Sequence, residues 1–335
     1  MKNLKLAAVC LSCLTMTGCS ALNFSVEGLI NAPKLTSEQS EIHQALIESV
    51  GSNITLKYPK NGEYRSAYVI ANIDDEPTDE AMVFYEYTSN GSEEDGLRVN
   101  ILDKDEDGKW YSVKELAGAG TDIDQVIISP MGSNNQTDVF VGYQNLTNDE
   151  KTMEIYSYTD GDFKRVALDT YSVLEPLDIN NDGYIELITI QRSTNNDTGA
   201  VTAKASMLNM KNNEITRGEN VDMCDNVTSY VSSKTGMLDS GRRAIFIDGL
   251  TADGKLQTEI IYYRYSGLQN PMQLRSEKLL PLCTRPAGYY SEDMDGDGDV
   301  EIPLTSPMVG YENAVADEML YMTTWKVGGQ AVLGR

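Results

Sequence analysis

Two short acidic segments hold the residues of this sequence that are best suited to chemistry. Residues 178–186 and 293–301 both fit the pattern D-x-[DN]-x-D-G-x-x-E. Oxygen-bearing side chains at alternate positions of a tight loop converge on one point, glycine permits the turn, and the final glutamate can complete the shell. Such a flexible set of oxygens suits calcium, whereas magnesium demands a stricter octahedron. The pattern therefore predicts two cation sites, with ion-free Asp/Asn/Gly turns as the alternative.

Two further acidic segments match the pattern less well. Residues 72–80 keep much of the charge but have Pro77 where glycine is expected, so they form a weaker candidate cation site. The ligands of the cation at this weaker site would be Asn72, Asp74, Glu76 and Glu80. Residues 103–108 have the opening spacing, but Tyr111 stands where the closing acid should be. We expect an exposed hairpin turn at that position.

The composition disfavours several other chemistries. His43 is the only histidine, which argues against Ser-His-Asp, Cys-His and histidine-rich zinc sites. The formal net charge of −24 at pH 7 argues against nucleic acid as a partner. Carboxylates are plentiful, so a paired-carboxylate mechanism stays open although no pair stands out. Cys224 and Cys283 lie 59 residues apart and could form a disulfide or remain two buried thiols.

One helix is expected before the main domain, over residues 36–51. Thr36 and Gln39 have the spacing of a capping box, and Gly51 ends the segment. The apolar face of this helix comprises Ile42, Ala45, Leu46 and Val50. The pattern predicts a short amphipathic helix packed on the main domain, with His43 beside its apolar face rather than acting as a ligand.

From residue 54 to residue 327 the sequence consists of short strand-like runs separated by turns rich in Asp, Asn and Gly. Four runs recur in each unit of about 50 to 58 residues. A single four-stranded sheet cannot bury both of its faces, and radial packing of such sheets solves this problem. We therefore predict an all-β fold, a β-propeller of about five four-stranded blades. A β-sandwich pair or an irregular all-β fold is the alternative.

The last unit of this repeat has three recognisable strands. The early strand Ile54–Tyr58 is expected to supply the fourth and close the ring, unless the chain is a truncated member of a longer family. Residues 328–335 have no strand pattern and are expected to form a tail.

In both full matches to the acidic pattern, the loop runs directly into a β-strand rather than a helix. This arrangement resembles the FG-GAP/VCBS repeats of integrin-type propellers and of many bacterial surface proteins. The resemblance implies structural calcium that braces loops between strands. The implied ligands are Asp178, Asn180, Asp182 and Glu186 in one loop, and Asp293, Asp295, Asp297 and Glu301 in the other.

The start of the chain resembles the export signal of a bacterial lipoprotein. An apolar run after two early lysines ends in Met16-Thr17-Gly18-Cys19, which resembles a lipobox. The resemblance implies a signal peptide over residues 1–18, lipidation of Cys19, and a tether over residues 19–35. Acyl chains on Cys19 would then anchor the protein to the cell membrane, facing its extracytoplasmic side.

The lipobox, the helix ending near Gly51, residues 58–65 and the acidic units together resemble lipoproteins of Gram-positive gut anaerobes. That resemblance implies a location on the cell surface. We expect a non-enzymatic, calcium-braced binding or scaffold module whose partner is an envelope protein or a glycan. A glycan-active enzyme with paired carboxylates and an envelope assembly factor are the alternatives.

Overall fold

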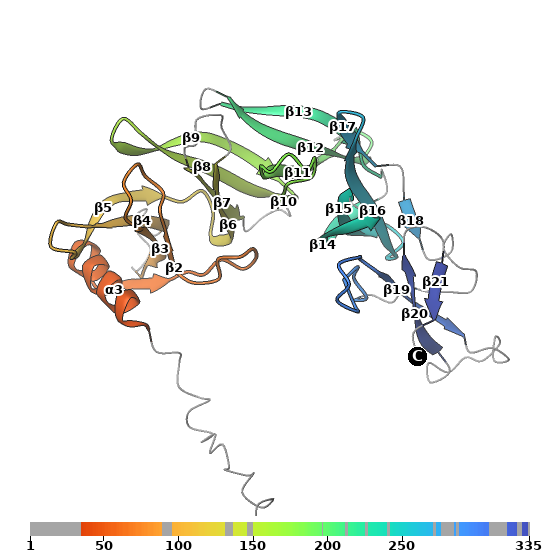
Figure 1. Cartoon of the computed structure of the whole chain (residues 1–335), viewed down its shortest axis with the longest axis horizontal. Coiled ribbons are helices and arrows are strands. Elements are labelled where there is room, and N and C mark those ends of the chain that lie inside the picture. Colours follow the sequence, from red (N-terminus) through yellow and green to blue (C-terminus); the bar gives the residue numbers. More distant parts are fainter. Residues whose placement is uncertain are drawn as a thin grey trace, which may run out of the picture. The chain divides into compact units, whose positions relative to one another are not determined.

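A computed structural model provides the structure of the chain (Figure 1). It describes residues 35–88, 96–130, 137–145, 150–195, 197–211, 214–224, 227–239, 242–270, 273–275, 285, 288–307, 320–326 and 330–333. The contacts divide the chain into two units, Met1–Glu41 and Ile42–Arg335. Within the described residues, no helix has the length and apolar character needed to cross a membrane.

The helix, α3, spans Ser37–Val50 and begins with the predicted capping box. The Thr36 N–H donates to Gln39 Oε1 at 3.1 Å, and the Gln39 N–H donates to Thr36 Oγ1 at 3.1 Å. Gly51 adopts a φ of +85° and its N–H donates to the Ile47 carbonyl, which ends the helix in the way that favours glycine. The helix therefore begins after its capping residue Thr36 and ends before Gly51.

The strands of the described residues form five antiparallel sheets that follow one another along the chain. Sheet 1 contains β1 (Ile54–Leu56), β2 (Tyr68–Ala71), β3 (Glu80–Tyr87), β4 (Leu97–Lys104) and β5 (Trp110–Ala117). Sheet 2 contains β6 (Asp122–Pro130), β7 (Thr137–Gln144), β8 (Lys151–Thr159) and β9 (Asp162–Tyr171). Sheet 3 contains β10 (Val173–Leu177), β11 (Glu186–Thr194), β12 (Val201–Lys211) and β13 (Glu214–Asp222).

The last two sheets complete the series. Sheet 4 contains β14 (Val227–Asp239), β15 (Arg242–Thr251), β16 (Leu256–Arg264), β17 (Gly267–Gln269) and β18 (Gln273–Arg275). Sheet 5 contains β19 (Ile302–Pro307), β20 (Leu320–Lys326) and β21 (Gln330–Leu333). Five successive antiparallel sheets with one short helix before them confirm the predicted all-β, propeller-like fold.

Two details of the prediction are wrong. The early strand β1 pairs with β3 inside sheet 1, with Ile54 opposite Tyr87, and so does not complete the last unit. Its apolar side chains pack in the same cluster as the helix, which holds the strand at that edge. Residues 330–333 form β21 rather than a tail, with Ala331 opposite Trp325. A strand of four residues is too short for its periodicity to be recognised in the sequence.

Apolar side chains on both faces of the sheets pack the sheets together. In β3, Met82 and Phe84 belong to a cluster shared with sheet 2, whereas Val83 and Tyr85 belong to a cluster shared with α3. Alternate residues of a strand point to opposite faces, so a strand covered on both sides is apolar throughout. Further clusters join sheet 2 to sheet 3 and sheet 3 to sheet 4. The first strands of sheets 2, 3 and 4, which are β6, β10 and β14, contribute side chains to these clusters.

Candidate functional site

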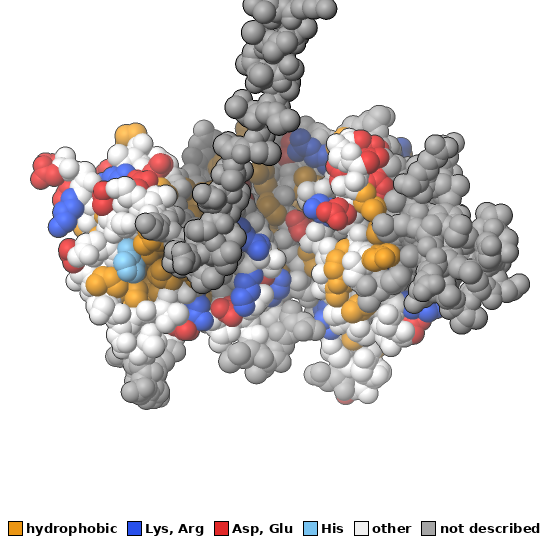
Figure 2. Space-filling view, turned by 90° about the horizontal axis from the view of Figure 1, so that it is seen from below, with side chains coloured by type: hydrophobic (Ala, Val, Ile, Leu, Met, Phe, Trp, Pro, Cys, Tyr) orange, Lys and Arg blue, Asp and Glu red, His pale blue; other side chains and the backbone are white. Residues whose placement is uncertain are grey.

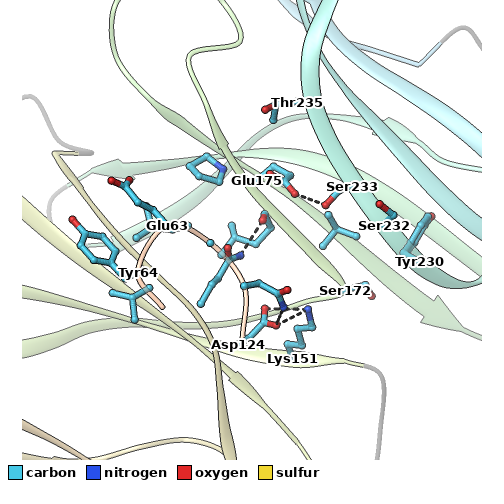
Figure 3. A pocket seen from close by; sticks show the side chains of 18 of the residues that line it. Glu63, Tyr64, Asp124, Lys151, Ser172, Glu175, Tyr230, Ser232, Ser233 and Thr235 are labelled. Carbon is cyan, nitrogen blue, oxygen red and sulfur yellow. Dashed lines mark hydrogen bonds and ion pairs between the residues drawn. The ribbon is translucent and has the colours of Figure 1, made fainter. Parts of the chain in front are cut away.

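A cavity of about 570 Å³ lies where the first strands of sheets 2, 3 and 4 approach one another (Figure 3). Its walls come from β6, β10 and β14, and residues 61–64 after β1 add a further side. The Gln125 side-chain amide donates to the Leu174 carbonyl at 2.9 Å, and this buried bond ties β6 to β10. The cavity is therefore built by strands from three sheets that are joined by direct contacts.

Asp124 in β6 is the most heavily bonded side chain of this cavity. Its carboxylate lies 2.9 Å from Lys151 Nζ, accepts from the Tyr171 hydroxyl at 2.6 Å and accepts from the Asn61 side-chain amide at 2.8 Å. Only 1% of the Asp124 side chain is exposed, whereas 26% of the Lys151 side chain is. All of these partners are donors or cations, an arrangement that suits a carboxylate anion.

Gly142 makes room for one of these bonds. A Cβ atom at position 142 would overlap the Tyr171 hydroxyl and would also approach Asp124. Since only glycine lacks that atom, Gly142 in β7 permits the Tyr171 hydroxyl to reach the carboxylate. The residue is thus part of the support of Asp124, although it has no side chain to contribute.

Glu175 in β10 is the second carboxyl group of the cavity. The Ser233 hydroxyl from β14 donates to its Oε1, as the dashed line in Figure 3 shows. Burial raises the pKa of Glu175 above its ordinary value, the charge of Asp124 raises it further, and Ser233 and Lys151 lower it. Glu175 therefore holds its proton more tightly than an exposed glutamate does.

Together, Asp124 and Glu175 provide two carboxyl groups in different environments. One is paired with a cation and surrounded by donors, and the other retains its proton to a higher pH. Such a difference is how two carboxyl groups take the separate roles of anion and acid. The arrangement can therefore protonate a leaving group and stabilise positive charge on a polar ligand bound in the cavity.

The sequence did not identify this pair. Asp124, Lys151 and Glu175 lie on three strands, and no local motif surrounds any of them. The one signal in the sequence was the abundance of carboxylates, which kept a paired-carboxylate enzyme open as an alternative.

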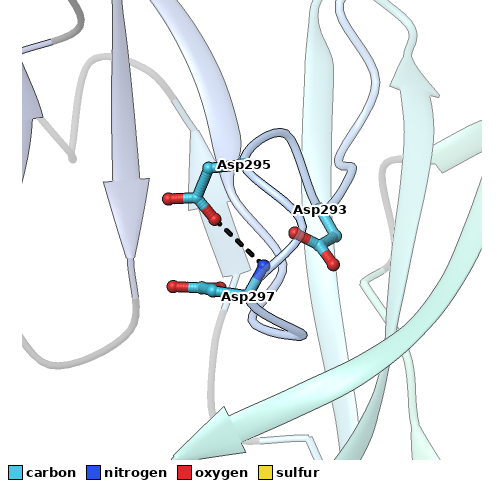
Figure 4. A group of neighbouring side chains, drawn as sticks. All are labelled: Asp293, Asp295 and Asp297. Atoms are coloured by element: carbon cyan, nitrogen blue, oxygen red, sulfur yellow. Dashed lines mark hydrogen bonds between the residues drawn. The ribbon is translucent and has the colours of Figure 1, made fainter.

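The structure brings three of the predicted metal ligands together. Asp293, Asp295 and Asp297 each offer an oxygen within 4.8 Å of the others, and no other group of three acidic, histidine or cysteine ligands does so among the described residues. Figure 4 shows the three carboxylates around the turn and the bond from the Asp297 N–H to Asp295 Oδ1. This cluster could hold a metal ion.

The loop 178–186 arranges its predicted ligands differently. The Asn180 amide donates to Glu186 Oε1 at 2.8 Å and to Asp182 Oδ2 at 3.0 Å. Arg243 of sheet 4 lies 3.3 Å from Asp178 Oδ2. Donors that come from the protein therefore already contact the oxygens that an ion would use.

The three acidic loops, over residues 72–80, 178–186 and 293–301, nevertheless contain the same type of hydrogen bond. In each loop the closing glutamate accepts, through Oε2, from the backbone N–H of the second loop residue. The pairs are Glu80 with Ile73 (2.8 Å), Glu186 with Ile179 (3.0 Å) and Glu301 with Met294 (2.8 Å). The recurrence shows that the acidic pattern has a common backbone geometry, also in residues 72–80, which match the pattern less well.

The weaker candidate loop over residues 72–80 concentrates negative charge around a buried acid. Only 1% of Glu80 is exposed. Burial, followed by the charges of Asp74 and Asp103, raises the pKa of Glu80 to about 7. The side chains of Asn72 and Asp74 bond to the backbone of Glu76.

Four other predictions concern a turn, a histidine, a disulfide and a lipidated cysteine. Residues 105–108 form the expected exposed hairpin turn between β4 and β5. His43 is partly buried and its Nδ1 lies 2.8 Å from the Tyr68 hydroxyl. Cys224 is buried, and Cys283 lies outside the described residues, so their disulfide stays a prediction. Cys19 also lies outside the described residues.

Comparisons with known proteins come from solved structures. No family model and no curated protein sequence matches the chain. A "putative 6-phosphogluconolactonase" from Bacteroides uniformis is similar at 13% identity and a TM-score of 0.36, over 83% of this chain and 80% of that one. A second protein of that name, from Bacteroides fragilis, is similar at 10% identity and a TM-score of 0.36, over 83% and 79%. A "glycoside hydrolase" is similar at 10% identity and a TM-score of 0.29, over 89% and 97%.

These comparisons correct the expected function. We expected a non-enzymatic binding or scaffold module, whereas the similar structures carry the names of enzymes. The likeness itself concerns the fold alone. The sequence pattern pointed to the acidic loops alone, because the cavity carboxylates are dispersed along the sequence.

Proposed function

We propose that this protein is an enzyme that hydrolyses glycosidic bonds in the cavity between β6, β10 and β14. The observation that supports the proposal is the presence in one polar cavity of a proton-retaining Glu175 and of Asp124, which is paired with Lys151. Glycoside hydrolysis uses two carboxyl groups in such different states.

Glu175 acts as both acid and base in the proposed reaction. Its carboxyl group gives a proton to the glycosidic oxygen as the bond from that oxygen to the sugar carbon breaks. A water molecule then bonds to the carbon and returns one proton to the Glu175 carboxylate, which restores the enzyme. The negative charge of Asp124 stabilises the positive charge that develops on the sugar ring in between. Tyr171, Lys151 and Asn61 keep Asp124 in position.

The test is hydrolysis of a panel of 4-nitrophenyl glycosides of neutral and acidic sugars. The wild-type protein should release nitrophenol from at least one of them, and Glu175→Gln should lower kcat/KM by about 100-fold or more, since the acid is lost. Activity should fall at high pH, with the midpoint above the ordinary pKa range of glutamate, because ionised Glu175 cannot donate its proton.

Glu106→Gln is the matched control, because Glu106 is exposed in the hairpin turn between β4 and β5. It should keep the wild-type rate. An inactive wild-type protein, or a Glu175→Gln variant with unchanged activity, would contradict the proposed function.

We further propose that the acidic loops bind calcium, as FG-GAP/VCBS-like repeats would. Asp293, Asp295, Asp297 and Glu301 would hold one ion, and Asp178, Asn180, Asp182 and Glu186 a second. The clustering of three carboxylates supports the first site. The shared closing bond of the glutamates supports a common loop design. Bound calcium would brace the connection between neighbouring strands and would take no part in hydrolysis.

We also propose that the protein is a lipoprotein on the extracytoplasmic side of the cell membrane. The lipobox-like sequence around Cys19 supports this location. In a bacterial host that carries out lipoprotein processing, the wild-type protein should sediment with membranes and incorporate labelled palmitate. Cys19→Ala should do neither. A wild-type protein that takes up no label would refute the anchor.

A further inference from the structure

A second cavity, of about 300 Å³, adjoins the first one. The two cavities share three lining residues, namely Lys151, Ser172 and Tyr230. A ligand that occupies the first cavity can therefore extend into the second along the wall that contains Lys151.

The smaller cavity has a different charge from the larger one. Lys151 and Arg192 line it together with Gln144 and Asn145, and no Asp or Glu is among its described lining residues. The larger cavity, in contrast, is lined by Glu63, Asp124 and Glu175 with Lys151 as its cation.

This local charge stands out in a strongly acidic chain. The chain has 51 Asp and Glu residues against 27 Lys and Arg residues. On the face shown in Figure 2, red acidic side chains accompany the blue basic ones. A cavity with two cations and no described acidic lining residue therefore departs from the composition of the chain.

The basic side chains of this cavity are held by structured strands. Lys151 is the first residue of β8, where its Nζ is paired with Asp124 and lies 5.6 Å from the centre of the Tyr171 ring. Arg192 belongs to β11 in the next sheet. Burial raises the pKa of Tyr230, the charge of Glu259 raises it further and the charge of Arg192 lowers it, so Arg192 and Tyr230 are electrostatic neighbours.

We propose that this smaller cavity binds an oxyanion group, a carboxylate or a sulfate ester, on the glycan whose glycosidic bond lies in the larger cavity. The inference rests on the proposed function, since it names the class of substrate that the same site accepts. A guanidinium group offers a planar pair of donors that matches two oxygens of a carboxylate or sulfate. The side-chain amide of Gln144 can add a neutral donor, whereas that of Asn145 already donates to the Glu150 carbonyl and to Thr152 Oγ1. No acidic residue among the described lining residues opposes the anion.

The experiment measures equilibrium binding by calorimetry to the whole chain. The probes are a galacturonic acid trisaccharide, a sulfated galactose trisaccharide and the uncharged galactose trisaccharide. The wild-type protein should bind at least one charged probe about 10-fold or more tightly than the uncharged one. Added salt should weaken binding of the charged probe and leave the uncharged one unaffected.

Variants of Arg192 test which residue is responsible. Arg192→Gln should weaken binding of the charged probe by about 10- to 100-fold and leave the uncharged probe unchanged. Arg192→Lys should recover part of the loss, because it keeps the charge without the planar donors. Arg264→Gln, at an exposed arginine outside both cavities, is the control. If Arg192→Gln fails to fold, Arg192→Lys and the salt dependence provide the test.

The outcomes separate this inference from the proposed function. Equal binding of charged and uncharged probes, binding of none, or an Arg192→Gln variant that binds like the wild type would overturn the oxyanion subsite. Hydrolysis of an uncharged glycan that depends on Glu175 would still support the enzyme. Conversely, Arg192-dependent binding of a charged glycan that is never hydrolysed would support the subsite and refute the hydrolase.

Discussion

The cavity around Asp124 and the loop around Asp295 hold their carboxylates in opposite ways. Asp124 is paired with donors that come from other parts of the chain, among them Lys151 and Tyr171. In the loop, Asp293 accepts from the N–H groups of Gly296 and Gly298, which belong to the same turn. The cavity therefore balances its charge through tertiary structure, whereas the loop concentrates negative charge that a cation can balance.

This difference predicts opposite responses to the removal of an acid. Loss of a carboxylate in the cavity leaves its donors and its cation without their partner, so the folded state should lose stability. Loss of a carboxylate in an ion-free loop relieves the repulsion between neighbouring carboxylates. The substitution should lower the free energy of unfolding, relative to wild type, only when calcium is present.

The largest effect is expected for Asp124→Ala. This change leaves Lys151, Tyr171 and Asn61 without a shared acceptor, which should cost about 3 to 5 kcal/mol in the free energy of unfolding. Urea unfolding of the purified protein measures this cost. Asp107→Ala, in the exposed hairpin turn, is the control and should stay within about 0.5 kcal/mol of wild type. A loss below about 1 kcal/mol would contradict the view that Asp124 organises the cavity.

The next effect concerns Glu80, whose pKa is about 7 in the folded state against an ordinary value of 4.5. Below pH 4.5 the residue is protonated in both states. As the pH rises towards 7, the unfolded chain releases this proton first, so the folded state loses stability. With calcium chelated, Glu80→Gln should therefore be more stable than wild type by about 2 to 4 kcal/mol at pH 8, and equal to it near pH 4.

Denaturant curves of both proteins across this pH range measure the effect. A difference that does not depend on pH would show that burial leaves the proton affinity of Glu80 unchanged. Calcium should reduce the advantage of Glu80→Gln if the loop over residues 72–80 binds the ion, since a bound cation favours the ionised carboxylate.

Calcium should stabilise the wild-type protein by about 2.7 kcal/mol at a hundredfold excess over its Kd. Asp297→Ala should remove a larger share of this gain than Asp182→Ala, because Asn180 and Arg243 already contact the acids of the second loop. Melting temperatures in EDTA, magnesium and calcium provide the measurement. If both variants lose the same share of the calcium stabilisation, the predicted difference between the two loops is wrong. If the double variant keeps the full calcium shift in melting temperature, both calcium sites are wrong.

The smallest effect is expected for Gly142→Ala. The added methyl group must displace the Tyr171 hydroxyl from Asp124, which should cost about 1 to 3 kcal/mol. Combining it with Tyr171→Phe gives a direct check, because the hydroxyl that clashes is then absent. A double variant no more stable than Gly142→Ala alone would show that the methyl group acts elsewhere.

The same contrast explains what the sequence could predict. The acidic loops are contiguous, so nine residues suffice to show both the turn and its ligands, and the structure confirms the cluster of three carboxylates. The capping box of α3 and the recurring strands are also local patterns, and both are confirmed.

The cavity could not be predicted in this way, because its parts meet only after folding. Asp124 and Glu175 are 51 positions apart, and Ser233 is 58 positions beyond Glu175. None of the three has a distinctive neighbour in the sequence. The predicted pairing of β1 was also wrong. A three-residue strand could complete either the first or the last sheet, and its packing in the same apolar cluster as α3 places it in sheet 1.

Lys151 links the two cavities in a way that has a thermodynamic consequence. Its positive charge lowers the pKa of Glu175 in one cavity, and its side chain lines the other. An anion bound in the smaller cavity would offset that charge and so strengthen the hold of Glu175 on its proton. Linkage is reciprocal, so protonation of Glu175 would tighten anion binding by the same factor. The protein would then be a proton-coupled receptor for its own substrate, with affinity that rises as its surroundings become more acidic.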